Sequence, residues 1–248
     1  MRIILAVMAA ASAIALPASG EMGRWSGEGA FSAGLNTGNT QTSDLGISVQ
    51  MERESQIWRN RFELTADYGT TEGAETKNRL YFDAGADRIL NDDLFAFGRL
   101  SHEINEFSAF ESRTFAGSGI GWLVFDEESP ANWSIEGGPG IRVDRLRETL
   151  SETPLEIVPA QTQETVSLIA ASKFGYTFND AVKFGNDTNM IYADTSTQVG
   201  NKSTLTALLT KSLSARVSFE VRHDSDPKTG FEETDTATRM SIVYAFGG

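Results

Sequence analysis

Two histidines are the only candidates for the general base of a catalytic triad, and their neighbours decide whether either could serve. Ser101 precedes His102, but adjacent residues of a strand point to opposite faces, so they cannot make the nucleophile–base contact that a triad requires. His223 stands beside Asp224 and near Asp226, at an expected strand end, where a surface histidine is the simpler interpretation. We therefore expect no enzyme, and keep a lipase- or protease-type barrel as an alternative.

The residue types and their spacing do not match known metal or cofactor sites. The chain has no cysteine and two scattered histidines, a set that does not match a zinc site. The acidic clusters at 126–128 and 232–235 offer oxygen ligands, but neither has the spacing of a known calcium loop, and solvation or cations that bridge lipopolysaccharide explain them as well. The glycine-rich run at 117–122 lies within a strand pattern with no helix after it, unlike a phosphate-binding loop. The sequence predicts no metal site and no cofactor.

The charge and the first residues limit the class of protein. A formal net charge of −13 argues against a nucleic-acid partner. A basic start, an apolar run over residues 3–16 and small residues at 18–20 form the pattern of a cleavable secretory signal peptide. We expect residues 1–20 to be this signal peptide and residues 21–248 to be one exported domain. No second long apolar stretch follows, which excludes a helical membrane protein.

Beyond residue 20, apolar and polar residues alternate with a period of two, which predicts β-strands with one face of each kind. Charges of both signs fall on the polar faces of the expected third and fourth strands. We expect these side chains to line the interior: Arg59, Arg61, Glu63, Asp67, Arg79, Asp83 and Asp87. A register that pairs Arg61 with Asp83 would also pair Asp67 with Lys77 and bring opposite charges together.

About twelve such strands are expected, separated by residues typical of turns. The predicted turns include Asn36–Asn39, Gly69–Gly73, Asn91–Asp93, Glu128–Pro130, Asn179–Asp180, Gly200–Asn201 and Asp224–Pro227. The stretch from 145 to 163, which holds two prolines, is predicted to be a long loop.

Alternating strands fit either a membrane barrel with its apolar face turned to lipid, or a soluble sandwich or lipocalin-like barrel with an apolar interior. Strands of ten or more residues favour the first, because they can cross a tilted outer-membrane wall. The last strand alternates and reaches Phe246, which is typical of an outer-membrane assembly signal, although two glycines follow it. Aromatic residues near strand ends resemble an interfacial girdle: Trp25, Trp58, Tyr68, Trp133, Tyr176 and Tyr192. The sequence predicts an all-β fold, an antiparallel up-and-down transmembrane β-barrel.

Short motifs stand in a characteristic order along nearly the whole mature chain. They are Trp25-Ser-Gly-Glu-Gly, Leu35-Asn-Thr-Gly-Asn-Thr, Leu94-Phe-Ala-Phe-Gly-Arg-Leu-Ser-His-Glu, Gly117-Ser-Gly-Ile-Gly-Trp, Leu213-Ser-Ala-Arg-Val-Ser-Phe-Glu-Val, Asp224-Ser-Asp-Pro, Thr234-Asp-Thr-Ala-Thr and Val243-Tyr-Ala-Phe. In this order and spacing they resemble the salt-induced outer membrane protein family, whose shared region is domain of unknown function 481. The resemblance implies an outer-membrane β-barrel. It brings no reaction, substrate or catalytic residue.

These observations together predict a barrel of the outer membrane with a structural or narrow porin-like role in envelope or osmotic stress. Twelve strands leave a narrow lumen, which inward charges could plug. The expected partners are outer-membrane lipid, lipopolysaccharide and the outer-membrane assembly machinery. Besides the barrel enzyme, a soluble periplasmic β-protein that binds a lipid-like ligand stays open as an alternative.

Overall fold

A computed structural model describes residues 23–36, 42–108, 110–125, 130–152, 155–227 and 232–247. The predicted signal peptide lies outside these ranges. No helix within them is long and apolar enough to cross a membrane.

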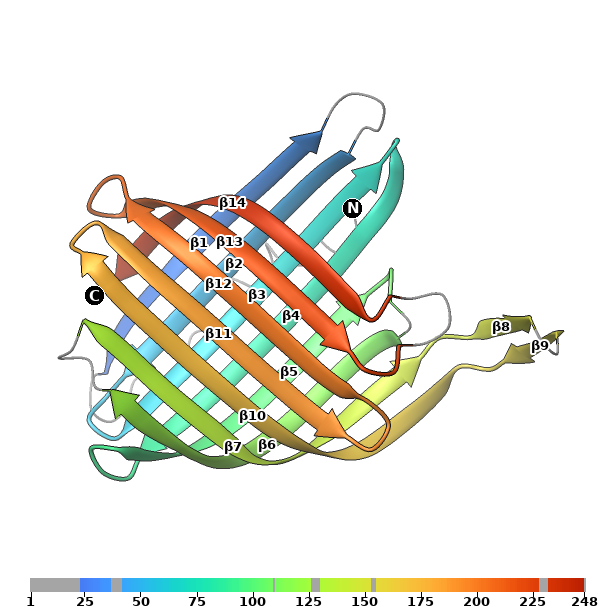
Figure 1. Ribbon diagram of the computed structural model, residues 1–248, viewed down its shortest axis with the longest axis horizontal. Coiled ribbons are helices and arrows are strands. Elements are labelled where there is room, and N and C mark those ends of the chain that lie inside the picture. The colour runs from blue at the N-terminus through green and yellow to red at the C-terminus, as the bar shows by residue number, and fades with distance from the viewer. Residues whose placement is uncertain are drawn as a thin grey trace.

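Twelve antiparallel strands form a closed barrel, as predicted, in which the first strand pairs with the last (Figure 1). Each barrel strand has 12 to 19 residues, more than the roughly 9–11 that cross an outer membrane at a tilt. The barrel strands are β1 (Arg24–Asn36), β2 (Thr42–Glu54), β3 (Trp58–Thr71), β4 (Ala74–Ile89), β5 (Leu94–Asn105), β6 (Phe110–Phe125), β7 (Ala131–Leu146), β10 (Gln161–Asn179), β11 (Val182–Ala193), β12 (Thr197–Leu208), β13 (Leu213–Asp224) and β14 (Thr234–Gly247).

The stretch predicted to be a long loop is largely a hairpin. Strands β8 (Thr149–Glu152) and β9 (Leu155–Val158) pair with each other and project beyond the barrel wall at the right of Figure 1. Strand β10 then begins at Gln161, earlier than expected. We call this side of the barrel the hairpin end, and the opposite side, where β1 begins and β14 ends, the terminal end.

The two faces of the wall differ in polarity. Large apolar side chains are exposed on the outside of every barrel strand, with Val166 at 79% and Met240 at 71%. The buried residues inside include Asp67, Asp87 and Asp144. This is the reverse of a soluble lipocalin-like barrel, whose interior is apolar, and it is the arrangement of outer-membrane barrels.

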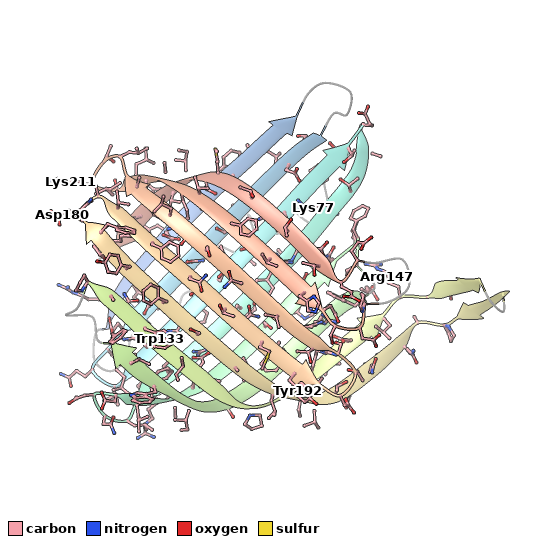
Figure 2. All side chains as sticks on the ribbon, viewed as in Figure 1. Lys77, Trp133, Arg147, Asp180, Tyr192 and Lys211 are labelled. Carbon is pink, nitrogen blue, oxygen red and sulfur yellow. The ribbon has the colours of Figure 1, made fainter. Side chains whose placement is uncertain are left out.

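The tryptophans gather at the terminal end. Trp58 begins β3, Trp25 lies one residue into β1, and Trp122 and Trp133 lie near the end of β6 and the start of β7. The first three are exposed on the outer face, and the indole of Trp133 donates a hydrogen bond to Ser172 Oγ. Figure 2 shows Trp133 at this end and Tyr192 toward the other.

The register between β3 and β4 differs from the prediction by two residues. Arg61 lies opposite Gly85 rather than Asp83, and Asp67 lies opposite Arg79 rather than Lys77. The connection is tighter than the predicted five-residue turn, because Glu72 and Gly73 both adopt positive φ and join the strands directly. A bulge between Gly69 and Thr70 then shifts the register by one more residue. A shift of two keeps every side chain on its face. Arg59 lies opposite Asp87 and Asp67 opposite Arg79, whereas Glu63 lies opposite Asp83.

A second correction concerns the predicted turn at Gly200–Asn201, which lies inside β12. The amide of Asn201 donates to Asn186 Oδ1 at 3.2 Å and to Thr188 Oγ1 at 2.7 Å on the neighbouring strand. Its polar side chain is therefore satisfied within the sheet, and neither residue uses the positive φ that turns require. The turn before β12 instead contains the buried Ser196.

Candidate functional site

The charged interior of the barrel is the candidate site. The seven predicted lumen charges lie on β3 and β4, on the face opposite to the outward Phe82 and Trp58. The structure brings four of them into two groups that centre on buried carboxylates, Asp67 and Asp87. Arg59 lies apart and forms ion pairs with Glu52 and Glu54 of β2.

The first group centres on Asp87, which is 2% exposed. Its carboxylate lies 2.9 Å from the guanidinium of Arg61 and 2.7 Å from that of Arg99. Arg99 in turn binds Glu136 of β7 through two hydrogen bonds. The group therefore links β3, β4, β5 and β7 across the intervening β6.

The second group crosses the lumen. Asp67 of β3 lies 3.4 Å from Arg79 of β4 and 2.6 Å from Arg239 of β14. Arg79 donates to Glu103 of β5 at 2.7 Å, and Glu103 lies 4.0 Å from Arg222 of β13. Arg222 and Arg239 stand on the neighbouring strands β13 and β14, so these five side chains, together with the wall between the two arginines, encircle part of the interior. We call Asp67, Arg79, Glu103, Arg222 and Arg239 the lumen ring.

A small polar cavity lies beside the lumen ring, against β1, β2, β13 and β14. Its volume is about 50 Å³, room for about three or four water molecules. Asp67 and Arg239 line one side of it, and Arg216, held by Glu28, lines another. Small polar side chains form much of the remaining wall: Ser32, Ser48, Gln50, Thr65, Ser218 and Ser241.

The opposite part of the lumen is filled by an apolar cluster. Phe95, Phe97, Phe115 and Ile169 are buried together on β5, β6 and β10. Their rings pack on glycines of the wall: a Cβ at Gly140 would lie 2.6 Å from the ring of Phe115. The polar cavity and the apolar cluster thus occupy different sides of the interior.

Sequence reasoning missed much of this site. Arg99, Glu103, Glu136, Arg222 and Arg239 lie on inward positions of their strands, and the same period-two pattern would have found them. What the pattern could not supply is the contact across the lumen, since Asp67 and Arg239 are 172 residues apart.

The histidines take no part in the lumen. His102 shares a hydrogen bond of 2.9 Å with Thr114 and His223 one of 3.0 Å with Thr234, each between neighbouring strands. Ser101 and His102 point to opposite faces of β5, as neighbours on a strand do. Among the described residues, no group of three His, Asp or Glu side chains could hold a metal ion. The acidic cluster at 126–128 lies outside those residues.

Comparison with known proteins gives the same fold. The family described as "Protein of unknown function, DUF481" matches residues 29–246. The uncharacterized protein YdiY of Escherichia coli K12 is 24% identical over 227 residues, 88% of this chain and 82% of that protein.

Three solved barrels are similar in structure at low sequence identity. They are the translocator domain of the autotransporter NalP from Neisseria meningitidis (TM-score 0.53, 11% identity, 99% of this chain and 96% of that one), the NanC porin (0.50, 12%, 89% and 98%) and an outer membrane channel from Pseudomonas putida F1 (0.50, 10%, 94% and 97%). At these identities the likeness concerns the fold alone.

Proposed function

The chain belongs to the DUF481 family, and because that family is described only as of unknown function, we propose a function from the lumen itself. The protein is a narrow outer-membrane channel for water-sized solutes and small ions, held nearly closed at rest by the lumen ring. The polar cavity beside β1 and β2 is the passage.

The lumen ring is the observation that carries this proposal. The Glu103–Arg222 pair joins opposite walls, and the Asp67–Arg239 pair reaches across β1 and β2. Both cross the interior beside the polar cavity, which has room for a few waters. Arg222 and Arg239 are partly exposed. Asp67 is buried but keeps Arg79 as a second partner, so a swing of the partly exposed Arg239 side chain opens this contact without leaving the carboxylate unpaired.

Planar-bilayer recording of the refolded protein tests the channel. Arg239→Ala removes one bridge and leaves Asp67 paired with Arg79, so no carboxylate is stranded. We expect small conductance steps from the native protein and several-fold larger ones from Arg239→Ala. Arg145→Ala is the matched control, because Arg145 is an exposed side chain bound to Glu111 away from the ring. Lipid-background conductance from the native protein and Arg239→Ala alike would exclude the channel and favour a structural barrel.

The location in the outer membrane is part of the proposal. It rests on the inverted polarity of the barrel and on the outward alternation of β14, with Met240, Ile242, Tyr244 and Phe246 exposed. We propose outer-membrane lipid, lipopolysaccharide and the assembly machinery as partners, and residues 1–20 as the export signal. Membrane fractionation with heat-modifiable gel mobility and N-terminal sequencing of the exported protein test these points. A mature chain that stays in the periplasmic supernatant would contradict them.

A role in osmotic stress follows from the family resemblance and stays a prediction. A strain lacking the protein should recover more slowly after a salt upshift than one complemented with the native chain. The absence of catalysis also stays a prediction; lipase or protease activity lost in His102→Ala or His223→Ala would overturn it.

A further inference from the structure

The pairing between β6 and β7 is interrupted near the middle of the wall, and we call this line the β6–β7 seam. Cross-strand pairing stops at Gly117–Gly140 and resumes at Ile120–Gly137, so the residues between are unpaired across this seam. Pro139, in the middle of β7, has no N–H to donate. A Cβ at Gly119 would overlap the backbone of Gly137 and Gly138, so the two strands touch where the ladder is broken.

A groove on the outer face runs from β3 across β4, β5, β6 and β7 to β10, and this seam forms part of its floor. Its volume is about 820 Å³, and it is open to the surroundings rather than enclosed. Small residues from both sides of the seam form its floor, among them Ala116, Ser118 and Pro139, and Phe62, Leu100 and Ile141 stand around it. The groove faces the hydrocarbon of the bilayer, because it lies on the exposed apolar face of the barrel.

The apolar cluster of the lumen lies directly behind the seam. Phe97 is the cross-strand partner of Gly119, and Ile169 is the partner of Gly138. The ring of Phe115 rests on Gly117 and Gly140. The rest of the interior is lined by polar and charged side chains. The one buried apolar cluster among the described residues therefore stands at the interrupted ladder, with an apolar groove on the other side of the wall.

A buried cation stands beside the cluster. Arg142, the cross-strand partner of Phe115, is 2% exposed. It forms an ion pair with Asp144 at 3.1 Å, but Asp144 is also bound by Arg113 at 2.6 Å, so two guanidinium groups share this carboxylate. Nη2 of Arg142 donates to two hydroxyls of the β11–β12 turn, while Nη1 has no hydrogen-bond partner in the described part of the chain. A buried unmatched donor of this kind favours an anionic group.

We propose that the β6–β7 seam is a lateral opening through which a long-chain fatty acid passes from the bilayer into the lumen. The hydrocarbon chain occupies the outer groove and then the apolar cluster, and the carboxylate binds Nη1 of Arg142. A free fatty acid fits better than a phospholipid, because a single chain with a small anionic head matches a small apolar cluster beside one unmatched cation. This path is separate from the polar passage proposed above.

Photolabelling of the native barrel in bilayers tests the opening. A fatty acid with a diazirine in its chain is irradiated with the refolded protein, and labelled peptides are mapped by mass spectrometry. We expect label on Phe97, Phe115 or Ile169 as well as on the groove, and competition by oleate but not by methyl oleate. Label confined to outward residues would overturn the proposal, as would equal interior labelling by a phospholipid that carries the same diazirine.

Two variants separate the seam from the head-group site. Ser118→Cys with Pro139→Cys introduces the only cysteines, at positions that face each other in the continued register, where a disulfide can form. Oxidation should abolish interior labelling and leave groove labelling, and reduction should restore it. Arg142→Gln should raise the probe concentration for half-maximal interior labelling about tenfold, the effect of one lost hydrogen bond to a charged group. Arg145→Gln on the same strand should not.

Unchanged interior labelling in the oxidised double-cysteine variant, or in an Arg142→Gln variant that retains native heat-modifiable mobility, would contradict the lateral path. Conductance of the native protein does not enter either result, so failure of the channel and failure of the fatty-acid path are distinguishable.

Discussion

At the scale of single residues, the interior depends on a few buried carboxylates that each serve two guanidinium groups. Removing one partner of a buried ion pair leaves uncompensated charge and costs about 3–5 kcal/mol. We expect Asp87→Ala to lower the free energy of unfolding by about this amount, because it strands Arg61 and Arg99 together. Urea titration followed by heat-modifiable gel mobility in detergent measures it.

The control for that measurement is a carboxylate in an exposed pair. Asp44 lies 2.8 Å from Lys77, and both side chains are well exposed to solvent. Asp44→Ala should therefore change the free energy of unfolding by less than about 1 kcal/mol. Equal losses in the two variants would show that burial of Asp87 carries no special weight.

Residue-level prediction from the sequence reached the faces but not the partners. Alternation alone assigned Asp67 and Asp87 to the polar face, because the side-chain period of a strand is two. The partners of these carboxylates depend on register and on the barrel cross-section. The short turn at Glu72 and Gly73, together with the bulge at Gly69 and Thr70, fixes the register. The closure of twelve strands fixes the cross-section. Neither is a local property of the sequence.

At the scale of elements, the glycines of β6 and β7 determine how closely the two strands approach. Gly119→Ala should destabilise the barrel by about 1–3 kcal/mol, the usual cost of overpacking, because its Cβ would overlap backbone that cannot move aside cheaply. The same unfolding assay measures the loss. Gly29→Ala, where a Cβ meets nothing within 4 Å, should be neutral or slightly stabilising. A loss as large at Gly29 would point to glycine flexibility rather than close approach.

Local sequence pattern predicted most strands correctly, but the same local pattern placed some strand boundaries wrongly. Strands such as β3 and β4 alternate strictly, so their existence and faces follow from the pattern. Gly200 and Asn201 carry a turn composition inside β12, and only the amide contacts with β11 show why the strand continues. The two prolines in the stretch from 145 to 163 indicate a loop, but the structure forms the β8–β9 hairpin there.

At the scale of the whole molecule, the barrel is asymmetric along its axis. The four tryptophans lie at the terminal end, and Trp25, Trp58 and Trp122 are exposed on the outer face. Indoles prefer the boundary between head groups and hydrocarbon. In bilayers of brominated phospholipid we expect tryptophan fluorescence to be quenched more by bromine near the head group than by bromine at the chain ends. Stronger quenching from the chain ends would contradict an interfacial girdle at this end.

The pairing of β1 with β14, which closes the barrel, has a mechanical consequence. Strands β1 and β14 share seven cross-strand pairs, from Ser26–Gly247 to Ser32–Ser241, whereas β1 and β2 share thirteen. The start of β1 and the end of β14 lie side by side, so a force that pulls them apart loads these pairs one after another rather than all at once. Under tension the barrel should therefore unzip along this line at low force, and the hairpins should peel away from the two new edges in sequence order.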